Sequence, residues 1–416
     1  MLVIIHYGEI ALKGDNRKFF EEKLVDNIKK ALITGLPCPV GSPAGDPFRV
    51  FDYVQRISGR ILVELKQEGK EGVKLLPPER KEFNSFREKA TFVLQRVFGI
   101  TYFAFATQCD LDIEVIKARA AEMLKDENFN SFKVETKRGN KSFVLTSQQV
   151  NEQVGETILN LKSQIANFRV DLHNPDVILY VEIIEKYAFL YTEKIAGPGG
   201  LPLGVSGKAI SLISGGIDSP VASYLMMKRG VENIFVHFFA TGQGFEQSLE
   251  KVRDILRTLK NYQEKIKVYF VPFSEAQKEI VLKTKADFRV VLYRRLMFLV
   301  ANEIAIQEKA KALITGESVG QVASQTLDNM LAIEEAVSLP VLRPLSGMDK
   351  IEIINMAKKI STYEISILPH LDCCSMFTPD HPATKANLKD VKTQEKKLKL
   401  KKIISQAIKN IIVENL

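Results

Sequence analysis

The first part of the chain changes from strand to helix periodicity and then returns to strand patterns. Residues 2–12 (LVIIHYGEIAL) are mostly apolar and predict a strand, and residues 16–32 carry apolar positions at helical spacing. Residues 36–47 (LPCPVGSPAGDP) are rich in proline and glycine and predict a loop. Two apolar runs, FRVFDYVQ and GRILVEL, then predict paired strands. We therefore expect a small α+β domain over residues 1–83.

The next part of the chain repeats this mixture of helical and strand patterns. The runs FNSFREKATFVLQRVFG, LDIEVIKARAAEMLKD and SQQVNEQVGETILNLK have apolar residues at helical spacing and predict helices. The runs TYFAFATQ and SFKVETKR predict single strands, and DVILYVEIIEKYAFLYTEK predicts a pair of strands. We therefore expect a second α+β domain over residues 84–195.

A glycine- and proline-rich segment, AGPGGLPLG (residues 196–204), predicts a linker before a third pattern. After it, short apolar runs such as KAISLI, ENIFVHFF and KIKVYFVPF alternate with helical stretches. This alternation is typical of a parallel sheet covered by helices. The sequence therefore predicts an α/β domain over residues 196–416.

Length, cysteine content and charge narrow the class of protein. A chain of 416 residues exceeds one compact core, and 45% hydrophobic residues are enough to bury several. Four cysteines are too few for a disulfide framework, so we expect a reducing compartment. The N-terminus lacks the pattern of a signal peptide, and no later run is long enough to span a bilayer. We expect a cytoplasmic protein without a membrane partner, whose net charge of +8 favours a polyanionic partner or serves solubility.

A glycine pair lies between a predicted strand and a predicted helix of the third domain. The segment SLISGGIDSP (residues 211–220) places Gly215 and Gly216 at this turn. Backbone N–H groups and the positive end of a helix dipole form an anion site there, which a Cβ atom would obstruct. The segment matches neither the Walker A pattern nor the dinucleotide fingerprint. A tight structural turn is the alternative, but the order strand, SGGIDS, helix favours phosphate binding.

The hexapeptide SGGIDS resembles the PP-loop of ATP pyrophosphatases, which split ATP between the α- and β-phosphates and adenylate a substrate. Four further segments, HYGEIALKGDNRKFFEEKL, FKVETKRGNKSF, LITGESVGQVASQTLDNM and DCCSMFTP, resemble the tRNA 4-thiouridine synthetases (tRNA uracil 4-sulfurtransferases). The resemblance runs over nearly the whole chain. It implies a ferredoxin-like domain (1–83), a THUMP RNA-binding domain (84–195) and a PP-loop domain of the adenine nucleotide alpha hydrolase-like α/β fold (196–416).

The resemblance also implies an activity and an ATP site. The activity is ATP-dependent sulfur transfer to a uridine of tRNA through an adenylated uracil, together with sulfur supply for thiazole (thiamine) synthesis. Asp218 is expected to act in catalysis by holding the phosphates through Mg²⁺. Arg294 offers a planar fork to phosphate, whereas His237 on its own would be interpreted as a packed histidine. The ATP-binding residues implied are Leu212, Ile213, Ser214, Gly215, Gly216, Asp218, Ser219, His237, Phe238, Arg294, Gly316 and Gln325.

Two adjacent thiols, Cys373 and Cys374, lie in the segment PHLDCCSMFTP. The resemblance assigns the catalytic persulfide to Cys374, and neighbouring cationic groups or a helix N-terminus would make such a thiol reactive. Two inert buried thiols are one alternative. A zinc site with His370 and His381 is another, but its spacing is unfamiliar, and we expect no metal site among these four residues.

The source of sulfur follows from a departure from the family pattern. Many members continue into a rhodanese domain whose cysteine delivers sulfur, whereas this sequence ends at Leu416. We therefore expect sulfur to reach Cys374 directly from a cysteine desulfurase or another persulfide donor. The candidates for a resolving thiol are Cys373, Cys109 and Cys38, although a vicinal disulfide would be strained. The sequence leaves room for a homodimer and leaves the role in thiazole synthesis open.

Two lysine-rich segments suit contact with RNA. Basic residues beside Phe132 and Phe143 fit an RNA backbone and exposed bases, with a solvated strand edge as the alternative. These tRNA-binding candidates are Lys133, Lys137, Arg138 and Lys141. Residues 385–402 hold eight lysines, which predict either a solvated helix face or an RNA-contacting helix.

Two other functions remain open at this level. One is another PP-loop enzyme acting on RNA, for instance an amine-inserting one, which the vicinal cysteines disfavour. The other is a non-catalytic tRNA-binding protein, which the intact SGGIDS segment disfavours.

Overall fold

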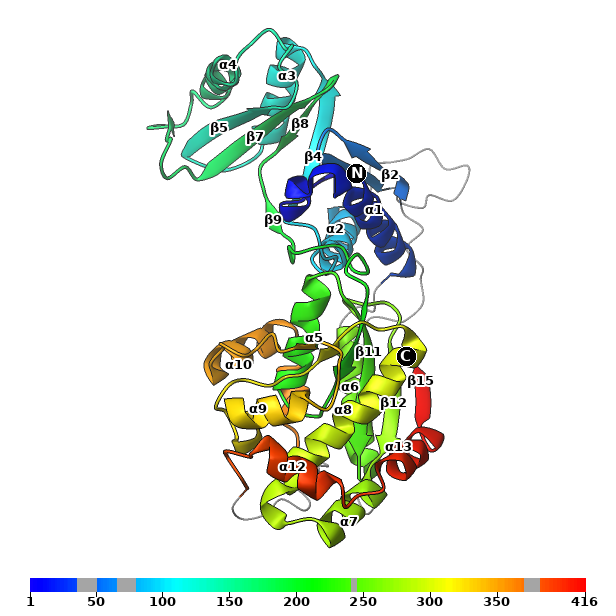
Figure 1. Cartoon of the computed structure of the whole chain (residues 1–416). Coiled ribbons are helices and arrows are strands. Elements are labelled where there is room, and N and C mark those ends of the chain that lie inside the picture. Colours follow the sequence, from blue (N-terminus) through cyan, green and yellow to red (C-terminus); the bar gives the residue numbers. More distant parts are fainter. Residues whose placement is uncertain (36–50, 66–79, 241–244, 370–381) are drawn as a thin grey trace. The chain divides into compact units, whose positions relative to one another are not determined.

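The computed structural model describes the chain except for residues 36–50, 66–79, 241–244 and 370–381 (Figure 1). The chain forms two compact units, Met1–Leu201 and Pro202–Leu416. The division falls inside the predicted linker, whereas a boundary at residue 83 stays a prediction. The loop predicted over residues 36–47 lies outside the described residues.

Unit 1 is built on one nine-stranded sheet in the order β2-β3-β1-β4-β8-β7-β5-β6, with β9 paired to β4. Its pairs are antiparallel, apart from those of β5 with β6 and β7. Strand β4 joins the two halves, because its first residues pair with β1 and its last residues with β8. The strands are β1 Leu2–His6, β2 Phe51–Ile57, β3 Arg60–Leu65, β4 Tyr102–Asp110, β5 Ser131–Arg138, β6 Arg169–Val170, β7 Val177–Ile184, β8 Tyr187–Tyr191 and β9 Ile195–Ala196.

Within the described part of unit 1, four α-helices accompany this sheet, and the helical patterns of the sequence predicted all of them. Helices α3 and α4 pack on strands β4, β5, β7 and β8 around a core that includes Ile116, Val154 and Leu179 (Figure 1). Asp112 caps α3, and Thr146 with Gln149 forms a capping box for α4, which sets where both helices begin. The helices are α1 Arg17–Thr34, α2 Arg80–Leu94, α3 Ile113–Leu124 and α4 Ser147–Leu161.

The strand predicted over residues 2–12 is too long. Strand β1 ends at His6, and a 3₁₀ helix follows over Glu9–Leu12. The two neighbouring strands explain this end, because β3 begins at Arg60 and β4 at Tyr102, which is the partner of His6. No neighbour remains to accept the hydrogen bonds of a longer strand.

A buried charged cluster links the two halves of the unit 1 sheet. Glu182 of β7 is 2% exposed and accepts hydrogen bonds from Arg60 Nε (2.6 Å) and the Tyr191 hydroxyl (2.6 Å). His6 of β1 lies with Nε2 at 2.9 Å from Glu182 Oε1 and stacks on Tyr102. Burial alone would raise the pKa of Glu182, but His6, Arg60 and Tyr191 hold it at about 2. Glu182 is therefore ionised in the folded unit at neutral pH.

Unit 2 contains a six-stranded sheet in the order β14-β13-β10-β11-β12-β15. The pairs from β14 to β12 are parallel, as the alternation of strands and helices predicted. Strand β15 pairs antiparallel with β12 at the edge, and the lysine-rich tail gave no sign of this strand. The strands are β10 Lys208–Leu212, β11 Glu232–Phe239, β12 Lys267–Pro272, β13 Leu313–Ile314, β14 Val341–Leu342 and β15 Ile412–Asn415.

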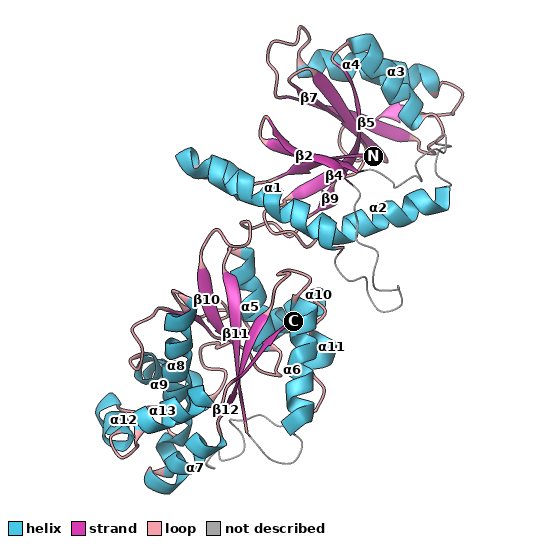
Figure 2. Cartoon of the chain, turned by 90° about the vertical axis from the view of Figure 1, so that its right-hand side faces the viewer, coloured by secondary structure: helices cyan, strands magenta, loops and turns pink. Residues whose placement is uncertain are grey.

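Helices cover both faces of this sheet (Figure 2). Helices α7, α8, α9, α12 and α13 share one apolar core with the strands, and α5, α6, α10 and α11 pack together on the other side. None of the described helices combines the length and apolar character required to cross a membrane. The helices are α5 Asp218–Lys228, α6 Phe245–Leu259, α7 Ser274–Lys283, α8 Arg289–Glu308, α9 Leu327–Glu334, α10 Lys350–Lys359, α11 Tyr363–Ser366, α12 Leu388–Glu395 and α13 Leu400–Lys409.

Candidate functional site

The glycine-rich loop joins the carboxyl end of β10 to the first residue of α5. Two serines fold it, because Ser214 N–H donates to Ser219 Oγ (2.8 Å) and Gly216 N–H donates to Ser214 Oγ (3.2 Å). Neither Gly215 nor Gly216 is among the described glycines with positive φ, and an added Cβ at Gly216 would meet only Ser214 Oγ at 3.5 Å. The turn itself therefore does not require glycine at residue 216. This favours close approach of a ligand over a purely structural turn.

A cavity of about 270 Å³ opens beside this loop at the carboxyl ends of β10, β11 and β13. All twelve residues predicted to bind ATP line it, although they come from separate segments of the sequence. Open α/β sheets hold their ligands at this position. Val236, Met297, Thr315 and Glu317 also line the cavity, and the sequence did not single them out.

Gly316 allows β13 to bring its loop against the phosphate loop. An added Cβ at Gly316 would lie 2.7 Å from Ser219 N and 2.8 Å from the carbonyl carbon of Asp218. No side chain fits at that distance without displacing the start of α5. Glycine is therefore required here by the close approach of two backbones.

His237 lines the cavity and is also a packed residue. It is 6% exposed, and its Nδ1 lies 2.9 Å from the carbonyl oxygen of Ile213. This contact ties the end of β11 to the start of the phosphate loop. The packed-histidine interpretation and the cavity-lining interpretation therefore both describe His237.

Asp218 has a lysine partner that the sequence did not reveal. Lys350, the first residue of α10, places its Nζ 2.5 Å from one carboxylate oxygen of Asp218. Gln321 donates to the other oxygen at 3.0 Å. Asp349 and Glu352 form a capping box that marks the start of α10 in the sequence, but nothing there indicates that Lys350 faces the phosphate loop.

Arg294 is held by a buried carboxylate. Glu317 is 1% exposed and accepts hydrogen bonds from Arg294 (2.5 Å), Arg343 Nε (2.8 Å) and Thr315 Oγ1 (3.0 Å). Burial alone would raise the pKa of Glu317, but the two guanidinium groups outweigh it and keep this pKa below its ordinary value. Glu317 is therefore a fixed anion that orients Arg294 at the cavity wall.

The four basic residues predicted to bind tRNA do not all lie on one surface of unit 1. Lys133 and Lys137 lie on the same face of β5, whereas Arg138 lies on the other and donates to the carbonyl oxygens of Phe143 and Leu145. The residues Lys137 and Lys141 are exposed. Arg138 therefore holds the turn after β5 together.

The aromatic part of the RNA-binding prediction is wrong. Phe132 is fully buried and stacks on Phe168, with ring centroids 5.3 Å apart. Phe143 packs against the same core. Neither ring is placed to stack on an exposed base.

Among the cysteines, the structure describes Cys109 alone. It is buried, and burial raises the pKa of its thiol to about 11. A protonated, buried thiol is a poor nucleophile, so Cys109 is a poor candidate for the resolving thiol. Cys38, Cys373 and Cys374, with His370 and His381, lie outside the described residues. Elsewhere in the chain the described residues contain no cluster of three metal-ligating side chains.

Comparisons with known proteins cover all three predicted domains. The family model "Thiamine biosynthesis protein (ThiI)" matches residues 204–400, "THUMP domain" matches 111–193 and "ThiI ferredoxin-like domain" matches 2–38. The "Probable tRNA sulfurtransferase" of Caldanaerobacter subterraneus subsp. tengcongensis is 45% identical over 413 residues, covering 99% of each chain. That of Moorella thermoacetica is 42% identical over 98% of this chain and 96% of its own.

Two solved structures are similar to this chain over most of its length. A 4-thiouridine synthetase, solved as an RNA complex with bound ATP, is 35% identical and has a TM-score of 0.80 over 100% of this chain and 99% of its own. PH1313 from Pyrococcus horikoshii is 26% identical with a TM-score of 0.59 over 86% of this chain and 99% of its own. The resemblance and fold class inferred from the motifs are confirmed. The chain belongs to the ThiI family of tRNA sulfurtransferases.

Proposed function

We propose that this protein uses ATP to transfer sulfur to a uridine of tRNA and forms 4-thiouridine. The observation that supports the proposal most is the cavity in unit 2. A phosphate-binding loop and residues from several distant segments, all implied by the family resemblance, line the same space. Relatives that match nearly the whole chain carry the name tRNA sulfurtransferase, and a 35% identical structure holds both RNA and ATP.

In the first step, the chain holds ATP and activates the base. The loop N–H groups and the α5 N-terminus face the phosphates, and Arg294, fixed by Glu317, adds a positive charge. Uracil O4 attacks the α-phosphate, pyrophosphate leaves, and the base becomes adenylated. Lys350 pairs with Asp218 beside the loop. Positioning of the two reactants accounts for much of the rate.

Mg²⁺ fits the site through Asp218. One or two carboxylates together with substrate phosphates are the usual ligands of Mg²⁺. Asp218 lies at the phosphate loop, and Mg²⁺ would replace its exposed partner Lys350, whereas Glu317 is buried between two arginines. When bound, Mg²⁺ would neutralise charge on the phosphates.

In the second step, Cys374 carries the sulfur as a persulfide. Its terminal sulfur attacks C4 of the adenylated uracil and displaces AMP. A second thiol then attacks the remaining sulfur–sulfur bond, which releases 4-thiouridine and leaves a disulfide that an external thiol reduces. A cysteine desulfurase or another persulfide donor reloads Cys374. The same persulfide would serve thiazole synthesis.

Contact with tRNA in unit 1 reduces to the exposed lysines of the predicted cluster. Lys137 and Lys141 suit phosphate contacts, whereas Lys133 is half-buried and pairs with Glu135 at 3.4 Å, and Arg138 has a structural role. We further propose a cytoplasmic location, in keeping with a tRNA substrate and a thiol chemistry. We also propose that the protein forms a homodimer, which its sedimentation coefficient would test.

The decisive experiment measures the nucleosides of tRNA after treatment with the protein, ATP and a persulfide-loaded cysteine desulfurase. Mass spectrometry should detect 4-thiouridine only when ATP is present. A control without tRNA should release little pyrophosphate. ATP-dependent pyrophosphate release without a sulfur-containing nucleoside would point to a different PP-loop chemistry. Absence of both products in a folded protein that binds tRNA would support a non-catalytic role.

A further inference from the structure

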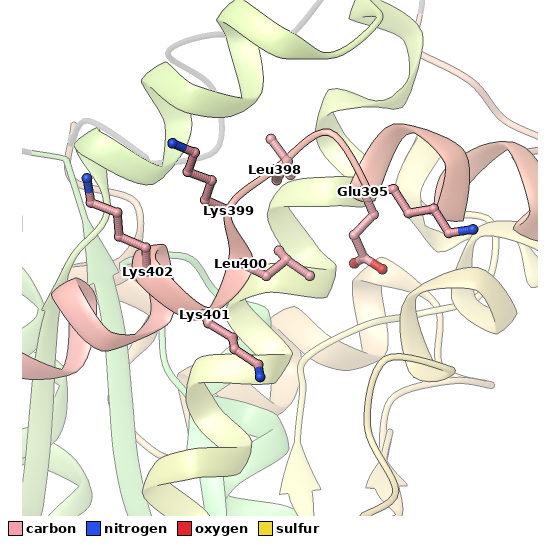
Figure 3. Close-up of a pocket in the computed structure, with 7 residues that line it drawn as sticks. Glu395, Leu398, Lys399, Leu400, Lys401 and Lys402 are labelled. Carbon is pink, nitrogen blue, oxygen red and sulfur yellow. The ribbon is translucent and has the colours of Figure 1, made fainter.

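Four exposed lysines lie where α12 ends and α13 begins. They line an open cavity of about 530 Å³ together with Glu395, Leu398 and Leu400 (Figure 3). Figure 3 shows Lys399 and Lys402 extending to the same side of the chain, whereas Lys401 points to the other side. We call this group the lysine junction, and its members are Lys396, Lys399, Lys401 and Lys402.

The backbone of the lysine junction is held in place by packing and hydrogen bonds. Leu398 and Ile403 are buried in the core of unit 2 on either side of it. The backbone N–H of Lys399 donates to the Glu279 carboxylate of α7 at 3.0 Å. Glu395 accepts two hydrogen bonds from Arg295 of α8, at 2.8 and 2.9 Å. The lysines therefore project from packed backbone, so binding an anion there costs only side-chain ordering.

Within the part of the chain that the structure describes, Glu279 attracts Lys399 electrostatically, but the junction keeps most of its positive charge. None of its four ammonium groups forms an ion pair there, whereas the nearby Lys392 pairs with Glu335 at 2.6 Å. The carboxylates close to the junction already have other cationic partners, since Arg295 holds Glu395 and Lys283 holds Glu279. This distinguishes the junction from an ordinary exposed helix face, where charges of both signs alternate.

The junction is coupled to the helix that forms the nucleotide site. Arg294 and Arg295 are neighbours on α8; the first lines the nucleotide cavity, and the second holds Glu395 of α12. Both features therefore belong to the same part of unit 2.

We propose that the lysine junction binds the phosphate backbone of the tRNA substrate. The proposal rests on the proposed function and adds a tRNA-binding surface on the catalytic unit itself. Lysine ammonium groups act as point charges that contact phosphates without reading sequence. The open, shallow form of the site and its lack of aromatic side chains fit a backbone rather than a base. Its role is to hold the tRNA on the catalytic unit while the uracil reacts.

The test compares two double variants of the full chain that remove equal charge. The first is Lys399→Gln with Lys402→Gln, which point to the same side of the junction. The control is Lys208→Gln with Lys311→Gln, two exposed lysines at the amino ends of β10 and β13, opposite to the nucleotide site. Binding of unmodified tRNA is measured without ATP as a function of salt, and circular dichroism checks the fold.

If both junction lysines contact phosphates, the salt slope should fall by about two units, because each lost contact removes about 0.9. At 0.05 M salt this corresponds to roughly tenfold weaker binding per lost contact. ATP binding without tRNA should be unchanged, and the control should keep the wild-type slope. The result does not depend on whether the wild-type protein forms 4-thiouridine, so failure of the proposed function is recognised separately.

Three results would overturn the proposal. An unchanged salt slope of tRNA binding in the folded junction variant would indicate that these lysines form only a solvated helix face. An equal loss in the control would reveal a general effect of net charge. Unchanged tRNA binding combined with a greater requirement for the sulfur donor would assign the junction to an acidic partner protein.

Discussion

Glu317 should act on ATP through Arg294, and a substitution can test this. In Glu317→Gln, one carboxylate oxygen becomes an NH₂ group, so one of the donors from Arg294, Arg343 and Thr315 faces another donor. Loss of a hydrogen bond to a charged group costs about 1.5–3 kcal/mol. If this cost appears as lost orientation of Arg294, ATP should bind about tenfold to a hundredfold more weakly.

The assay is calorimetric binding of an ATP analogue with a non-cleavable α–β bridge, so that turnover does not interfere. Arg294→Ala alone should weaken binding by a similar factor. The double variant Arg294→Ala with Glu317→Gln should be no weaker than Arg294→Ala, because the second change acts only through the residue already removed. Glu334→Gln is the control, since Glu334 also binds Arg343 but does not line the cavity.

Additive losses in the double variant would show that Glu317 affects ATP without Arg294. Wild-type binding by a folded Glu317→Gln protein would refute the positioning role altogether. Because breaking a buried pair can cost about 3–5 kcal/mol of stability, the thermal midpoint of each variant must be measured alongside. A variant that melts below the assay temperature is replaced by Thr315→Val, which removes the neutral donor to Glu317 at a residue that also lines the cavity and should weaken ATP binding less.

Three further predictions concern the loop, the thiols and unit 1. Asp218→Ala should abolish pyrophosphate release while the fold persists, because it removes the carboxylate at the phosphate loop; normal release would exclude this role. Cys374→Ser should still release pyrophosphate but form no 4-thiouridine. Cys373→Ser should retain measurable thiolation, slowed if Cys373 resolves the disulfide, and external reductant should then restore turnover; the opposite pattern would exchange the two roles. Glu182, with a folded pKa of about 2 against an ordinary 4.5, should add about 3 kcal/mol to stability above pH 4.5 and lose it as the pH falls toward 2. Hydrogen exchange of β7 amides should follow this loss in the wild type and much less in Glu182→Gln, whereas parallel curves would contradict it.

The nucleotide site could be predicted from the sequence because its residues lie in recognisable motifs. SGGIDS follows a strand, and residues 237, 238 and 316 come at the ends of the next parallel strands, which meet at one edge of the sheet. The partners of these residues could not be predicted. Lys350 is 132 residues from Asp218 in the sequence, and no local pattern distinguishes it from the many other lysines. Ion pairs at such separation are fixed by tertiary packing alone.

The burial of Phe132 could have been predicted from the alternation of side chains along its strand. In the strand SFKVETKR, residues at alternate positions face opposite sides of the sheet, so Phe132 and Val134 share one face and Lys133 and Lys137 the other. Apolar residues on the first face predict burial against a helix layer, which is what the structure contains. An aromatic residue next to a lysine in a strand is therefore evidence against a shared RNA-binding surface. A binding surface requires residues two positions apart.

The lysine-rich tail shows the limit of arguments from charge. Its eight lysines are equivalent as a run of letters, yet the fold gives them different surroundings. Lys392 faces the carboxylate of Glu335, whereas Lys399 and Lys402 project from a junction whose nearest carboxylates are already paired. What decides whether a lysine can attract RNA is the charge left after its neighbours are counted. Those neighbours come from α7, α8 and the residue after α9, as well as from Glu395 in the tail itself. The inference about the junction therefore required the structure, although the lysines themselves were visible from the start.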